Sequence, residues 1–156
     1  MGMAINQRTR VIRVNTGTVA GTTDINCPSS SGVDMSQNGG YRGVRFIALM
    51  GALTGTQVTK LKVQGSPDGS DYTTLGGDLL ATATAAMADA DGTKMLVCDV
   101  YRPVHRYLRA VVDRGTANAV IDGVIAELYD PISEPTSDDT TVSASKTAIS
   151  PPLGTA

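Results

Sequence analysis

The chain of 156 residues has few aromatic and few charged side chains. It contains no tryptophan, one phenylalanine and five tyrosines, and only 18% of its residues are charged, whereas about a quarter is usual in globular domains. The sequence contains seventeen glycines and many threonines, alanines and serines in place of bulkier residues. This composition suits short strands and turns better than long helices, and the length predicts one domain, with room for a tail.

Long hydrophobic segments are also missing. No apolar run approaches the ~18 residues that a membrane helix needs. Residues 1–6 lack the apolar stretch of a secretory signal. We therefore expect no membrane partner.

Cysteine and histidine are scarce. Cys27 and Cys98 are too few for a disulfide framework, and we expect both to be reduced, Cys27 in a loop and Cys98 in a buried strand. His105, the single histidine, lies between two arginines; we interpret it as an exposed turn residue, with pairing to Cys98 as the alternative. The sequence shows no nucleophilic side chain paired with a general base, so we expect no enzymatic activity and no cofactor.

Aspartates cluster near two turns, but neither cluster has the spacing of a calcium loop. Asp68, Asp71 and Asp78 are better explained as turn residues than as a weak calcium site. The glycines between positions 51 and 55 have no Gly-Lys-Ser/Thr ending, so we interpret that segment as a hairpin turn rather than a phosphate loop.

The charge is small and uneven. The net charge is −2, with +4 in residues 1–60 and −6 in the remainder. A nucleic-acid-binding domain would carry a strong basic excess, so we expect no nucleic-acid partner. The asymmetry fits a basic N-terminal segment that contacts acidic surfaces.

Alternating apolar residues predict an all-β fold. Strands are expected over residues 8–14, 43–50, 57–64, 94–101, 106–114 and 118–129, with a short edge strand within 18–23 and a return strand beginning at 72–75. Thr59, Leu61 and Val63 should face inward, and Gly123 should mark a bulge or a point of close approach. Residues 78–90 fit either a short helix capped by Asp78 or extended chain. The pattern favours an antiparallel β-sandwich or jelly roll of about eight strands.

The C-terminal composition changes abruptly after residue 130. Residues 131–156 contain four prolines, many serines and threonines, and few apolar side chains. Such a segment cannot bury enough surface to offset its chain entropy, so we predict an extended arm that lies on a neighbouring subunit. The chain then divides into residues 1–42, a strand and long loop forming part of the sandwich or an arm; residues 43–130, the core; and residues 131–156, the arm.

Arginines flank two of the expected strands. Arginine is favoured at protein interfaces because its planar fork pairs with carboxylates, although a solvated strand face is the competing interpretation. Nucleic-acid binding is disfavoured because no aromatic platform accompanies these residues. The candidate interface residues are Arg8, Arg10, Arg13, Arg102, Arg106 and Arg109, together with Ile132, Val142, Ile149 and Leu153 of the arm; Arg114 belongs to the same basic group.

Several segments carry a resemblance to a known class of proteins. They are the apolar stretch 46–54, the hairpin Val63-Gln64-Gly65-Ser66-Pro67-Asp68-Gly69-Ser70-Asp71-Tyr72, the stretch Asp99-Val100-Tyr101-Arg102-Pro103 with 106–109, and residues 116–120. Over residues 43–129 the chain resembles capsid decoration, or cement, proteins of tailed bacteriophages.

The resemblance implies a structural virion protein without catalysis. It implies a homotrimer made in the host cytoplasm and seated between capsomers on the outer capsid surface, where it bridges subunits of the major capsid protein. The alternatives are a phage tail, collar or head-fibre component, and a module that binds glycans or a host surface. The few aromatic residues weaken the glycan interpretation.

Overall fold

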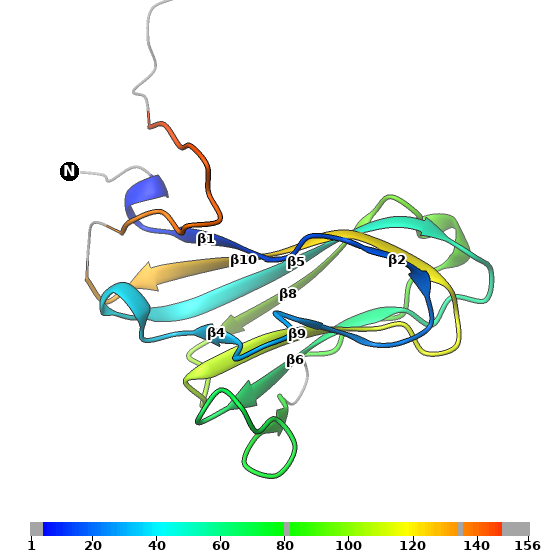
Figure 1. Ribbon diagram of the computed structural model, residues 1–156, viewed down its shortest axis with the longest axis horizontal. Coiled ribbons are helices and arrows are strands. Elements are labelled where there is room, and N and C mark those ends of the chain that lie inside the picture. The colour runs from blue at the N-terminus through cyan, green and yellow to red at the C-terminus, as the bar shows by residue number, and fades with distance from the viewer. Residues whose placement is uncertain (1–4, 80–81, 134–135, 148–156) are drawn as a thin grey trace, which may run out of the picture.

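The computed structural model describes residues 5–79, 82–133 and 136–147 and consists of two antiparallel five-stranded sheets (Figure 1). Sheet A contains, in order, β1 (Arg10–Asn15), β10 (Ala119–Pro131), β5 (Tyr41–Leu53) and β8 (Met95–Tyr101), and β2 (Thr18–Gly21) also pairs with β10. Sheet B contains β3 (Ile25–Cys27) and β4 (Val33–Asp34), both paired with β9 (Tyr107–Asp113), followed by β6 (Lys60–Ser66) and β7 (Gly77–Asp78). Three 3-10 turns, η1 (Ile5–Gln7), η2 (Gln37–Gly39) and η3 (Asp89–Asp91), are the helical elements of the described residues. The predicted all-β sandwich is confirmed, with ten strands.

The core lies between the two sheets and follows the predicted alternation. Phe46, Leu61 and Leu128 are fully buried, and burying each side chain of this size contributes about 2 kcal/mol. The inward positions expected on β6, β8 and β9 are all buried: Leu61 and Val63; Leu96, Cys98 and Val100; Leu108, Ala110 and Val112. A period of two therefore predicted which face of each strand is internal.

The paired strands β5 and β10 form the centre of sheet A. The register between them shifts between Ile121 and Gly123, which confirms the predicted bulge. β5 does not turn at Gly51 but continues to Leu53. A Cβ on Gly51 would lie 2.9 Å from Val120 Cγ1, so glycine here permits close approach of the two strands rather than a hairpin.

The return strand expected at Tyr72–Leu75 is wrong. These residues form a loop because the Asp71 carboxylate takes up two of their backbone donors, and the Asp68 carboxylate takes up the donors of the two residues before them. Asp68 Oδ1 accepts hydrogen bonds from the N–H groups of Ser70 and Asp71, and Asp71 Oδ1 accepts from those of Thr73 and Thr74. Strand pairing with β6 resumes only at β7.

The helix considered for residues 78–90 is absent from the described part of that segment. The chain instead runs extended beside β6, with Thr84 N–H donating to Leu61 O and Met87 N–H to Thr59 O, both at 2.8 Å. Residues 79 and 82–87 thereby cover the edge of β6 that does not face β9, and the need of that edge for hydrogen-bond partners outweighs the helix propensity of alanine.

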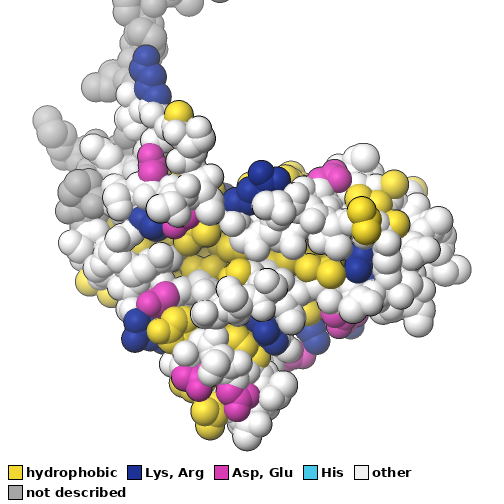
Figure 2. Space-filling model, in the orientation of Figure 1, with side chains coloured by type: hydrophobic (Ala, Val, Ile, Leu, Met, Phe, Trp, Pro, Cys, Tyr) yellow, Lys and Arg dark blue, Asp and Glu magenta, His cyan; other side chains and the backbone are white. Residues whose placement is uncertain are grey.

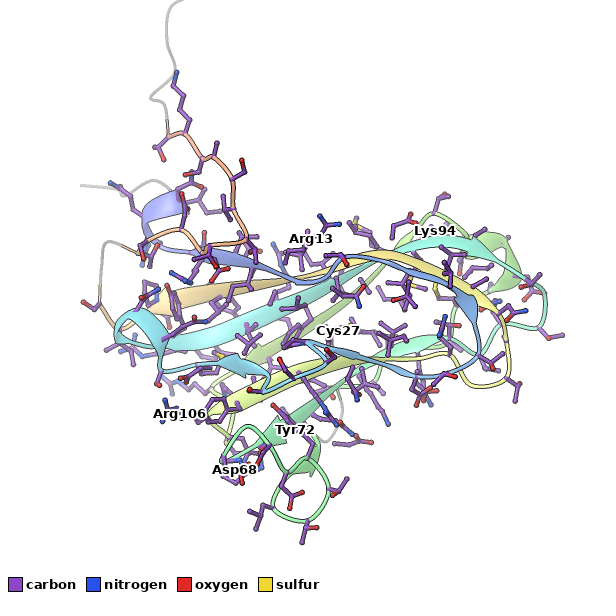
Figure 3. All side chains as sticks on the ribbon, viewed as in Figure 1. Arg13, Cys27, Asp68, Tyr72, Lys94 and Arg106 are labelled. Atoms are coloured by element: carbon purple, nitrogen blue, oxygen red, sulfur yellow. The ribbon has the colours of Figure 1, made fainter. Side chains whose placement is uncertain are left out.

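The N-terminal third is more ordered than a single strand and a long loop. Its residues add β1 and β2 to sheet A and β3 and β4 to sheet B. The placement of Cys27 in a loop is wrong: it lies on β3, fully buried between the two sheets (Figure 3). Burial raises the pKa of its thiol to about 12. Both cysteines are free, as predicted.

Candidate interaction surfaces

The outer face of sheet A carries a contiguous group of apolar side chains. In register across the sheet, Ile125 of β10 lies beside Ile47 of β5, and Ile47 lies beside Val97 of β8. The next row places Leu49 beside Met95. We call these five residues the apolar band. Met95 and Val97 are 60% and 47% exposed, and the other three are half-buried. A solvated sheet face would carry polar residues here.

A row of paired charges borders the apolar band. Glu127, Arg45 and Asp99 are neighbours in register on β10, β5 and β8. Arg45 forms an ion pair with Glu127, and Asp99 accepts a 2.7 Å hydrogen bond from the Tyr129 hydroxyl. Partial burial and the Asp99 carboxylate raise the pKa of Tyr129. Tyr129 also stacks on Tyr101, with 6.2 Å between the ring centroids.

The strand β8 forms an open edge of sheet A. Met50 N–H donates to Lys94 O, and Arg102 N–H donates to Arg42 O, so even-numbered residues direct their backbone groups toward β5. Since alternate residues of a strand direct these groups to opposite sides, the odd-numbered residues of β8, from Met95 to Tyr101, direct theirs away from β5. Among the described residues no backbone or side-chain group bonds to these outward N–H and C=O groups.

The opposite edge of sheet A is covered by the C-terminal arm. Thr136 N–H donates to Gln7 O at 3.1 Å, and Arg13 N–H donates to Thr141 Oγ1 at 3.0 Å. Arg10 donates to the carbonyl of Ser137 and pairs with Asp139 at 2.8 Å. Residues 136–141 therefore run parallel to β1 along its edge, within the same chain.

Beyond this contact the arm leaves the sandwich (Figure 1). Residues 143–147 are exposed, and two hydrogen bonds of the described chain involve them: Asn6 Nδ2 donates to Lys146 O at 3.5 Å, and the Ser145 hydroxyl donates to Asp138. Val142 lines an open cleft of about 270 Å³ with Thr141 and with Leu49 and Ile125 of the apolar band.

A third surface lies at one end of the sandwich. An open groove of about 440 Å³ is found there, and its lining includes Arg102, Val104, His105, Arg106 and Ile132. Val104 is 83% exposed and Ile132 is 63% exposed. Arg106 pairs with both carboxylate oxygens of Asp34, at 2.9 and 2.7 Å, and its hydrogen bonds lower the pKa of Asp34 to about 2.

The ten candidate interface residues are therefore spread over different surroundings. Arg8 and Arg13 are exposed, whereas Arg10 holds the arm. Arg109 lies over the ring of Tyr72, with its guanidinium carbon 3.9 Å from the ring centroid, and donates to Gln64. Arg102, Arg106 and Ile132 share the end groove, and Val142 lies by the apolar band. Ile149 and Leu153 lie outside the described residues.

Arg114 has a different role from the surface arginines with which it was grouped. It is 3% exposed and donates to the carbonyls of Thr23, Val19 and Ala119 at 2.6, 3.0 and 2.9 Å. It therefore joins β2 and the residues before β3 to the start of β10.

His105 and Cys98 have separate partners. His105 packs against Gly65 of β6, while the Cys98 thiol donates to Thr82 O at 2.6 Å.

No cluster of three or more metal-ligating side chains occurs within residues 5–79, 82–133 and 136–147. In the same ranges no helix is long and apolar enough to cross a membrane.

Figure 2 shows hydrophobic side chains gathered along the middle of the viewed face, between the layer of β1 and the layer of β4 and β9.

Comparison of the chain with protein-family models, with curated proteins and with solved structures gave no match. Function is therefore argued from the surfaces themselves.

The apolar band was not among the predicted site residues, although the sequence carries a signal for it. Residues 46–50 are apolar at both odd and even positions, which indicates a strand covered on both faces. In the structure β5 lies in the interior of sheet A, between β10 and β8. The side chains that should cover the outer face are absent from the described residues of this chain, apart from the neighbouring Val142.

Proposed function

We propose that this chain is a structural virion protein that decorates a bacteriophage capsid and stabilises it by bridging neighbouring subunits of the major capsid protein. The observation that carries the proposal is the apolar band, exposed on the outer face of sheet A beside an arm that leaves the sandwich. A face of this kind on a small domain is a binding surface. The arm adds a second attachment point.

Two attachment points on one rigid domain suit a protein that bridges a lattice. Weak contacts that engage together give strong retention, because binding of the second site becomes intramolecular. The resemblance to decoration proteins supplies the partner and the trimeric state, with the outer capsid surface as the location. The apolar band supplies the part of this sandwich that would face the capsid protein.

The test measures binding of purified protein to capsids of the source phage assembled without it. Met95→Glu places a charge in the apolar band, and we expect capsid occupancy at a fixed protein concentration to fall at least tenfold. The matched control is Leu75→Glu, because Leu75 is 58% exposed but lies in the loop after β6; this variant should bind like the unmodified protein.

Equal occupancy by the two variants would overturn the role of the apolar band. Failure of the unmodified protein to bind such capsids would overturn the decoration function itself.

A further inference from the structure

Sheet A has two unlike edges, and this asymmetry has a consequence for assembly. The edge at β1 is covered by residues 136–141 of the arm. The strand β8 spans seven residues and, among the described residues, pairs with β5 alone, so its other edge carries no paired strand. Native proteins shorten, charge or cover such edges because unpaired strands add to other strands. In sheet B the outer edge of β6 is covered by residues 79 and 82–87.

We propose that residues 142–147 of one copy add as a parallel strand to the open edge of β8 in a second copy. The inference deepens the proposed function, on which its biological setting rests, by naming the site through which copies of the chain join. Strand addition of this kind obtains affinity from backbone hydrogen bonds and specificity from alternate side chains.

The alternation of the arm matches that of β8. Val142, Ala144 and Lys146 fall on one side of an extended chain, and Ser143, Ser145 and Thr147 fall on the other. In parallel register, Val142 then lies beside Met95, Ala144 beside Val97 and Lys146 beside Asp99. The register pairs apolar with apolar side chains and cation with anion, each of which stabilises neighbouring strands. An antiparallel register that joins Lys146 to Asp99 leaves Val142 beyond the end of β8.

Residues 143–147 are available for this contact, whereas Val142 must leave the cleft that it lines beside Leu49 and Ile125 of its own chain. Residues 143–147 are exposed and point away from their own sandwich (Figure 1), and the two hydrogen bonds that involve them are replaceable at the new site. Residues 136–141 already run parallel to an edge strand in their own chain, since they follow it from Gln7 of η1 to Arg13 of β1.

The geometry produces a head-to-tail contact. An arm at one edge of sheet A and an acceptor at the opposite edge are different surfaces, so each copy can donate one arm and accept another. Such contacts close into rings when the rotation between copies permits. A ring of three would agree with the trimer expected from the resemblance.

The test is the solution mass of the isolated full-length chain, measured by light scattering on a sizing column without capsids. We expect an oligomer that dissociates when residues 143–156 are deleted. Val97→Pro removes one outward N–H of β8, at a position where β5 needs no donor, and should raise the dissociation constant at least tenfold. Val97→Thr keeps that N–H and should assemble normally.

A charge exchange tests the register without altering the backbone. Asp99→Lys and Lys146→Asp should each weaken assembly about tenfold, and the double variant should restore it to within about threefold of the original. Failure of the double variant to recover would overturn the register.

A full-length chain that remains monomeric at all concentrations would overturn the inference while leaving capsid binding by the apolar band untouched. So would an oligomer unaffected by the deletion. Conversely, an arm-dependent oligomer that does not bind capsids would support this inference and refute the decoration function.

Discussion

Arg114 shows how a single buried charge organises the N-terminal third of the protein. Its guanidinium group donates to three carbonyls from β2, the loop before β3 and the start of β10. The carbonyls of Val19 and Thr23 lie more than 90 residues from Arg114 in sequence, and the guanidinium fork supplies enough donors to satisfy all three carbonyls together. A charged residue at the end of a strand gives no local indication of this role.

Replacing Arg114 should therefore destabilise the fold. Arg114→Met keeps much of the apolar stem but removes the donors to the buried contact with Ala119 O and to the two part-buried contacts with Val19 O and Thr23 O. We expect a loss of about 3 kcal/mol in the free energy of unfolding. Urea denaturation measures this. Arg13→Met, at an exposed position on β1, is the control and should change stability by no more than about 0.5 kcal/mol. Equal effects of the two substitutions would contradict the role of Arg114.

At the scale of elements, β8, β5 and β10 are joined on the outer face by a tyrosine that covers a glycine. A Cβ on Gly43 would overlap the ring of Tyr129, and this ring stacks on Tyr101 of β8. The absence of a side chain on the central strand thus allows aromatic rings from both neighbouring strands to meet above it.

Gly43→Ala should push the Tyr129 ring off its stack and away from Asp99. We expect a cost of about 1–2 kcal/mol in the free energy of unfolding, as for other insertions of a methyl group into a packed site. In a Tyr129→Ala background the same change should cost less than about 0.5 kcal/mol, because nothing then occupies the space. A double-mutant cycle by chemical denaturation measures the difference. An equal cost in both backgrounds would show that the ring is not the obstacle.

At the scale of the whole molecule, the reactivity of the two thiols indicates whether the two sheets are still packed together. Cys27 and Cys98 are 0% and 6% exposed, one from each sheet. Burial raises both thiol pKa values, that of Cys27 to about 12, and the thiolate is the reactive form. Neither thiol can therefore react until the two layers separate.

We expect both cysteines to resist alkylation at neutral pH and to become reactive over the same range of urea concentration. Mass spectrometry of the alkylated protein counts the modified thiols, and far-ultraviolet circular dichroism follows unfolding in parallel. Rapid modification of either thiol without denaturant would contradict a jointly closed core. The agreement of the two curves would show that the sheets open as one cooperative unit.

Local patterns in the sequence determined the longer strands and their inner faces, although not the short strands β3, β4 and β7. The inward positions of β6, β8 and β9 followed from a period of two, and the bulge at Gly123 followed from a glycine within a long strand. The lack of helix and strand within residues 136–147 also followed from composition. These features depend on neighbouring residues and on whether each side chain meets water, which a linear pattern records.

The tertiary structure alone decided which strands are neighbours and which edges stay open. The apolar band joins residues of β5, β8 and β10 that are far apart in the chain. Residues 136–141 lie on β1 of the same chain, and Tyr72 lies in a loop over Arg109 rather than in a strand. The Asp71 carboxylate drew backbone donors away from the expected return strand. Pairing and register are set by the packing of the whole molecule, and a local pattern carries no record of the strand that will lie beside it.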